Sequence, residues 1–171
     1  MDDFTRSAIL FVQEHQRWGI SIVFLLAFCE SFAFISLLVP ATGILFGVGG
    51  LVAAADIQLW PIWFAAASGA VAGDWLAYKV AYHFKDRVTR LWPFKNRATL
   101  VTRGLKFFKR WGLIAVFLGR FFGPLRAVVP IAAGIYAMPW LTFQLANVAS
   151  AAVWATGILT PGFLSLRWMI G

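Results

Sequence analysis

The chain has 171 residues, of which 61% are hydrophobic and 13% charged, and its mean hydropathy is +0.78. A chain of this length forms one domain, which we place at residues 1–171, and its apolar content predicts an all-α membrane protein. Its formal charge is +8, and its single cysteine, Cys29, excludes an intramolecular disulfide and a thiolate metal cluster.

Four apolar stretches follow one another along the chain. They span residues 18–55, 61–82, 111–138 and 139–170. Because a membrane-spanning helix needs about 20 apolar residues, these stretches supply four to six membrane passes or part-passes.

Four ionisable residues lie inside the apolar stretches. They are Glu30, Asp74, Arg120 and Arg126. A single charge at the centre of a bilayer costs about 2.5–3.5 kcal/mol, so we expect these side chains to face a protein interior or a wet cavity. Two acids and two arginines balance in charge. The set therefore predicts a polar pocket that holds an anion, a proton or both.

Proline and glycine interrupt two of the stretches. Pro40 and Gly43 lie in the first, whereas Gly123, Pro124 and Pro130 lie in the third. Proline removes a backbone donor and glycine weakens a helix. We interpret these residues as hinges of discontinuous or re-entrant helices, which are tolerated only where they are buried or line a cavity. An ordinary kinked helix is the alternative.

The two halves of the chain fall into register when Pro40 is aligned with Pro130. Glu30 then lies ten residues before the first proline, and Arg120 lies ten residues before the second. Broken segments at corresponding positions of two halves are typical of inverted repeats in transporters. The alignment therefore predicts two structural repeats.

We expect each repeat to be a re-entrant helical hairpin followed by a transmembrane helix. The first repeat covers about residues 18–83, the second covers about residues 111–168, and a basic amphipathic segment at about residues 84–110 joins them. With this topology the two repeats insert in opposite orientations. If every limb crosses the membrane instead, both termini lie on the same side as the joining segment.

The joining segment carries most of the positive charge. Ten of the fifteen Lys and Arg residues fall within residues 79–110, where the one acid is Asp86. The positive-inside rule places this loop in the cytoplasm and explains its charge without nucleic acid. Val101, Leu105 and Phe108 recur at helical spacing, which predicts a short amphipathic helix lying on the anionic leaflet.

Arg120 and Arg126 are candidates for binding a phosphate. On an uninterrupted helix their side chains would point about 120° apart, but Gly123 and Pro124 between them would let both converge on one point. The guanidinium group stays protonated and its planar fork matches phosphate oxygens. The alternative is that each arginine reaches an interface or pairs with an acid for stability alone.

The two acids have different candidate roles. Glu30 would either pair with an arginine for structure or hold a proton, which makes it a candidate proton carrier. Asp74 follows a G-x-x-x-G face, Gly69 to Gly73, that favours close helix packing and would permit a homo-oligomer. Asp74 would form a second binding site or hold the arginines in place. Asn147 can donate hydrogen bonds across helices.

Motifs of enzymes are missing from the sequence. It has no H-E-x-x-H and no G-x-S-x-G. His15 and His83 flank apolar stretches without partners at metal-ligand spacing. We therefore expect no cofactor, no metal and no catalytic residue, and we predict that the protein is not an enzyme.

Several segments resemble one known family. Residues 117–126, F-L-G-R-F-F-G-P-L-R, resemble the hallmark of the DedA family, also called VTT or SNARE-associated domain proteins. Residues 73–78 resemble the family's G-D-x-x-x-Y segment, and Glu30 lies where the family carries its intramembrane acid. The resemblance covers about residues 20–160. One departure is Thr42, which stands where the family commonly has a second acid.

The resemblance implies a transporter of the bacterial inner membrane that moves undecaprenyl phosphate or a phospholipid between leaflets. In this hypothesis Arg120 and Arg126 hold the phosphate, Glu30 exchanges with it or carries a proton, and Asp74 supports the arginines. Thr42 completes the substrate site and changes or removes one route of proton coupling. Two alternatives stay open. One is a membrane enzyme acting on lipid phosphates or part of a larger lipid-phosphatase polypeptide, and the other is a non-transporting scaffold.

Overall fold

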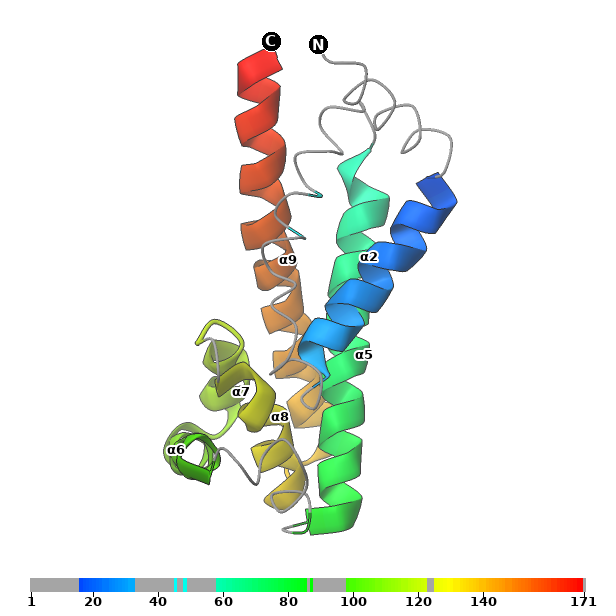
Figure 1. Ribbon diagram of the computed structural model, residues 1–171. Coiled ribbons are helices and arrows are strands. Elements are labelled where there is room, and N and C mark those ends of the chain that lie inside the picture. The colour runs from blue at the N-terminus through cyan, green and yellow to red at the C-terminus, as the bar shows by residue number, and fades with distance from the viewer. Residues whose placement is uncertain are drawn as a thin grey trace.

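The computed structural model describes residues 16–32, 45, 48, 58–85, 87, 98–122 and 125–170 (Figure 1). Within these residues the chain forms six helices and no strand, which confirms the all-α class. The helices are α2 (Gln16–Ser31), α5 (Leu59–Phe84), α6 (Ala98–Trp111), α7 (Leu113–Gly119), α8 (Leu125–Ile135) and α9 (Trp140–Ile170).

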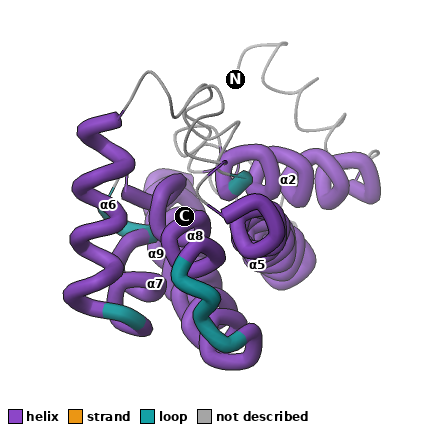
Figure 2. The backbone as a smooth tube through the Cα atoms, turned by 90° about the horizontal axis from the view of Figure 1, so that it is seen from below, coloured by secondary structure: helices purple, strands orange, loops and turns teal. Residues whose placement is uncertain are grey.

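Two long helices, α5 and α9, run side by side through the molecule (Figure 1). They contain 26 and 31 residues, so each exceeds the length of about 20 residues that a membrane span needs. Trp140–Leu164, within α9, is both long and apolar enough to cross a membrane. The short helices α7 and α8 pack together near one end of this pair, and α6 lies on the other side of the molecule from α2 (Figure 2).

The G-x-x-x-G face of α5 packs directly against α2. A Cβ atom added to Gly69 would lie 2.3 Å from the carbonyl oxygen of Phe24, and one added to Gly73 would lie 2.6 Å from that of Phe28. The two glycines therefore let the helix backbones approach, as the sequence predicted. Since α2 covers this face, a homo-oligomer would have to use another surface.

The amphipathic helix predicted in the basic loop is present as α6, and part of its apolar face packs against α8. Val101 and Phe108 are buried, and Gly104 is so close to α8 that an added Cβ would lie 2.4 Å from Val128 Cγ1. Arg103 and Lys106 of the same helix are exposed.

The break between α7 and α8 lies at residues 120–122, which form a turn. Helix α8 runs through Pro130, so the interruption that we predicted at that proline is not there. A proline in the second turn of a helix removes one backbone hydrogen bond and crowds the carbonyl group of the preceding turn, which can kink a helix without ending it. The other predicted hinges and Thr42 lie outside the described residues: Pro40, Gly43, Gly123 and Pro124.

Candidate functional site

The structure brings the four ionisable residues of the apolar stretches together as two buried ion pairs. The exposed fraction is between 4% and 6% for each of them. Arg120 pairs with Asp74, and Arg126 pairs with Glu30. In both pairs the acid comes from the first half of the chain and the arginine from the second half. The pairs therefore join the two halves electrostatically.

The Asp74–Arg120 pair is anchored to α9. Arg120, in the turn after α7, donates from Nη2 to Asp74 Oδ2 on α5 and, over 2.7 Å, to Asn147 Oδ1. Its Nε donates to Ser150 Oγ over 3.1 Å. Asn147 Nδ2 in turn donates to the carbonyl oxygen of Val71. Three helical segments are thus tied together through one guanidinium group.

Within the described part of the chain, Arg126 donates fewer side-chain hydrogen bonds than Arg120 does. Arg126 Nη1, at the start of α8, donates to Glu30 Oε1 over 2.6 Å, and its Nη2 donates to Ser31 Oγ over 2.8 Å. Both hydrogen bonds go to the last turn of α2. The indole ring of Trp154 on α9 completes the surroundings, because the ring centre lies 4.6 Å from Arg126 Cζ.

Trp154 links the two pairs. Its ring centre also lies 6.0 Å from Arg120 Cζ, so both guanidinium groups are within cation–π range of the same indole. The turn at residues 120–122 provides the change of direction that this convergence needs. Arg120 accordingly interacts electrostatically with Asp74 and also with Glu30 and Arg126.

Some buried polar atoms of this cluster lack hydrogen-bond partners within the part of the chain that the structure describes. They are Asp74 Oδ1, Arg120 Nη1 and Arg126 Nε. A buried donor without a partner costs about 1–3 kcal/mol, and more when it is charged. Two guanidinium donors near one indole ring are therefore available to the oxygens of an anion.

Sequence reasoning missed three members of the cluster. Ser31, Ser150 and Trp154 were not predicted as site residues, whereas Asn147 was expected to form hydrogen bonds across helices that serve packing. On α9, residues 147, 150 and 154 follow the three- and four-residue spacing of one helix face. That spacing was a readable signal for α9, whereas Ser31 becomes relevant only because Arg126 is folded against it.

Metal ligands are not grouped in the described residues. Among them, no set of three or more His, Cys, Asp or Glu side chains is placed to hold a metal ion. The charged chemistry of the described site therefore rests on guanidinium, carboxylate, amide and hydroxyl groups.

These features define an all-helical membrane protein whose two halves meet at a buried cluster of opposite charges. The chain belongs to the VTT domain family, whose profile matches residues 35–164, and this confirms the resemblance to the DedA family. No solved structure matches it.

Named relatives are also membrane proteins. The chain is 30% identical to the inner membrane protein YabI of Escherichia coli, over 91% of the chain and 61% of that protein. It is 27% identical to the inner membrane protein YghB of the same species, over 84% of the chain and 68% of that protein. It is 35% identical to the uncharacterized membrane protein Rv2637 of Mycobacterium tuberculosis, over 61% of the chain and 52% of that protein. The chain thus spans about three fifths of the length of YabI.

Proposed function

We propose that this chain forms the core of a transporter that moves a phosphate-bearing lipid, undecaprenyl phosphate or a phospholipid, between the leaflets of a bacterial inner membrane. The observation that carries the proposal is the buried cluster of Arg120 and Arg126, whose guanidinium groups retain free donors beside Trp154. Membership of a family of membrane proteins fits such a transport role.

The phosphate would bind where the two arginines converge. A lipid phosphate offers several acceptor oxygens, and guanidinium groups bind such oxygens through charge-assisted hydrogen bonds. Arg120 Nη1 and Arg126 Nε would donate first because they break no existing bond. A lipid without a phosphate would lack these bonds between opposite charges.

Glu30 would be displaced from Arg126 by the phosphate and would then take up a proton. Both groups are anions that compete for the same guanidinium donor, so binding of one weakens binding of the other. Loss of its cation favours the neutral form of a buried carboxyl group. Lipid binding and protonation would therefore occur together, and re-formation of the Glu30–Arg126 pair would release both.

Movement of one proposed repeat against the other would change the distances within the buried cluster of ion pairs. We propose that α7 and α8 form a re-entrant hairpin and that α9 is the following span, with the first half of the chain as its inverted counterpart. In support, α7 has 7 residues and α8 has 11, so both are shorter than the roughly 20 residues of a full span. Any sliding of one half against the other would stretch both ion pairs.

The basic residues 85–110 would face the cytoplasm, as the positive-inside rule predicts. The exposed position of Lys106 on α6 offers a direct test of this orientation. Lys106→Cys, placed on a Cys29→Ser background, should resist an impermeant thiol reagent added outside intact cells. Strong external labelling would reverse the proposed orientation.

The proposed transport is tested with purified protein in vesicles that carry a fluorescent phospholipid in both leaflets. Movement is measured as the fraction of lipid that an external quencher reaches, and hydrolysis is measured by mass spectrometry of the same lipid. We expect movement without loss of phosphate. Release of phosphate would identify an enzyme, and neither movement nor release with undecaprenyl phosphate or phospholipids would identify a scaffold.

A further inference from the structure

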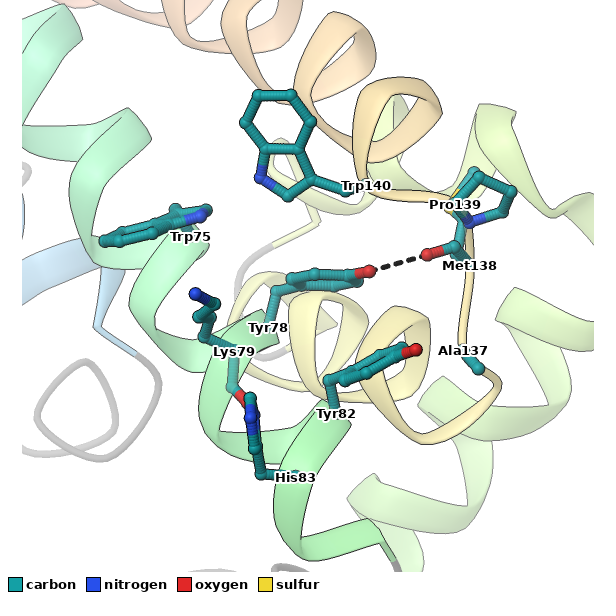
Figure 3. Close-up of a pocket in the computed structure, with 9 residues that line it drawn as sticks. All are labelled: Trp75, Tyr78, Lys79, Tyr82, His83, Ala137, Met138, Pro139 and Trp140. Atoms are coloured by element: carbon teal, nitrogen blue, oxygen red, sulfur yellow. Dashed lines mark hydrogen bonds between the residues drawn. The ribbon is translucent and has the colours of Figure 1, made fainter.

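A second pocket lies away from the charged cluster, between the C-terminal half of α5 and the connection from α8 to α9 (Figure 3). Its volume is about 580 Å³, and none of the four buried ionisable residues lines it. Figure 3 shows Trp75, Lys79 and His83 along one wall and Met138 and Trp140 across from them.

The wall of this pocket is held by tight helix packing. The hydroxyl group of Tyr78 donates to the carbonyl oxygen of Met138 over 2.6 Å (Figure 3), and its ring stacks on Phe143 at a centroid distance of 4.4 Å. At Gly134 an added Cβ would lie 2.5 Å from the carbonyl oxygen of Tyr78. These contacts fix α5 against the α8–α9 connection, so the pocket is part of the folded structure.

The pocket is positively charged and aromatic. Lys79 Nζ lies 5.4 Å from the ring centre of Trp75, and Lys85 Nζ lies 4.5 Å from that of Tyr82 at the rim. His83 Nδ1 lies 3.0 Å from the carbonyl oxygen of Lys79, to which only a protonated Nδ1 can donate. With Nδ1 used in this way, Nε2 can donate to a ligand oxygen only as part of the doubly protonated imidazolium, and His83 would contact a phosphate in that charged form. The nine residues that line the pocket include no Asp or Glu.

We propose that this pocket binds the phosphate headgroup of an anionic lipid. Lys79 and His83 would contact the phosphate, while Trp75 and Trp140 would contact the glycerol and the first acyl carbons. Tryptophan and lysine together are typical of positions at the membrane–water interface. The aromatic rings alone would also suit a quaternary ammonium group, but the Lys79 ammonium repels such a cation. Charge complementarity therefore selects the anion.

This pocket extends the proposed function, because it would hold a lipid of the same chemical class before or after passage through the arginine cluster. Lys79 and His83 lie five and nine residues after Asp74 on α5. At 1.5 Å per residue these separations correspond to about 8 and 14 Å along the helix. A headgroup bound to Lys79 and His83 would thus lie about 8 to 14 Å along α5 from Asp74, a member of the buried ion pairs.

Photo-cross-linking tests the pocket directly. Purified protein in phosphatidylcholine vesicles receives a phosphatidate whose acyl chain carries a diazirine near the glycerol, and labelled peptides are identified by mass spectrometry. We expect labelling at residues 75–83 and 137–140. In the double variant Lys79→Gln, His83→Gln, labelling there should fall roughly tenfold, as expected for lost bonds to a charged group.

A matched control is Lys106→Gln, Arg103→Gln, which removes two exposed cations from α6 instead and should keep the labelling. A diazirine phosphatidylcholine should label the pocket weakly. Excess dioctanoyl phosphatidate should compete with the label, whereas excess inorganic phosphate should not. Equal labelling of the two lipids, equal competition by inorganic phosphate or unchanged labelling in the double variant would overturn the proposal.

Failure here is distinguishable from failure of the proposed function. The pocket is read out by binding, which needs no movement of lipid, and Lys79 and His83 are exposed and outside the buried cluster. A protein that binds phosphatidate in the pocket but moves no lipid would retain this site and refute transport. A protein that moves lipid but shows no pocket labelling would refute this site and retain the proposed transport.

Discussion

The two buried ion pairs differ in how firmly they are held. Arg120 donates to Asp74 and also to Asn147 and Ser150, both of which belong to α9. Arg126 donates to two residues at the end of α2, Glu30 and Ser31. The first pair therefore ties a turn to two long helices, whereas the second ties the start of α8 to the end of α2.

This difference in hydrogen bonding suggests that one ion pair has a structural role and that the other can open. A guanidinium group with three fixed acceptors loses several bonds when it moves, and each bond to a charged group contributes about 1.5–3 kcal/mol. Among the described residues, Arg126 donates to fewer partners and its Nε has no hydrogen-bond partner. We infer that the Asp74–Arg120 pair holds the fold together and that the Glu30–Arg126 pair opens when a ligand binds.

The largest expected effect is that of Arg120→Ala on stability. The variant leaves Asp74 buried without its cation, and removing one partner of a buried pair costs about 3–5 kcal/mol. Chemical denaturation in mild detergent measures the free energy of unfolding. The exposed Arg103→Ala on α6 is the control, with an expected change within about 0.5 kcal/mol. Equal stabilities would show that the first pair does not hold the fold.

Asn147→Ala should destabilise the protein by about 1.5–3 kcal/mol, because Asn147 accepts a bond from Arg120 and donates to the carbonyl oxygen of Val71. Ser31→Ala, which removes one bond from Arg126, should cost less. The same denaturation measurement ranks the two variants. A larger loss for Ser31→Ala would invert the comparison between the two pairs.

Gly134→Ala should cost about 1–3 kcal/mol, because its Cβ would lie 2.5 Å from the carbonyl oxygen of Tyr78 and push α8 away from α5. Gly157→Ala on α9 is the matched control, since its Cβ meets nothing within 4 Å. That control should be neutral or stabilise the helix by up to about 1 kcal/mol. Similar values for both would mean that α8 tolerates displacement.

Glu30→Gln keeps an amide oxygen that can accept the bond from Arg126 Nη1 but leaves Arg126 buried without its counter-charge, so we expect a loss of stability smaller than that of Arg120→Ala. The amide cannot ionise, however, so lipid movement in vesicles should no longer depend on pH between about pH 5.5 and 8.5. Thr42→Asp, which introduces the acid typical of the family, should alter the pH profile without abolishing binding. If lipid movement in both variants depended on pH as it does in the parent protein, proton coupling through these residues would be refuted.

The charged residues of the site were predictable because the cost of burying a charge in a membrane is large. That cost marked Glu30, Asp74, Arg120 and Arg126 before any contact was known. The close approach of α5 to another helix was also predictable. Gly69 and Gly73 carry no side chain, so they leave room for the backbone of a neighbouring helix.

The remaining contacts depend on distances between helices that sequence spacing does not contain. Ser31 and Ser150 are short polar side chains that many helix surfaces carry, and they matter here because an arginine reaches them. An interruption was also predicted at Pro130, but α8 continues through that residue, because a proline can kink a helix without ending it. The apolar face of α6 was predicted to lie on the anionic leaflet, and the structure packs part of it against α8. An apolar helix face does not by itself specify whether lipid or protein covers it.

The most direct test of the central claim is lipid movement by Arg126→Lys in vesicles, compared with Arg110→Lys on the exposed face of α6. Lysine keeps the positive charge but lacks the planar fork that binds phosphate oxygens. We expect the Arg126→Lys protein to fold and to move phosphate-bearing lipid roughly tenfold more slowly than the parent, as expected for one lost charge-assisted bond. The Arg110→Lys protein should move lipid at the rate of the parent. Equal rates for all three proteins would contradict the claim that the buried guanidinium groups bind the lipid phosphate.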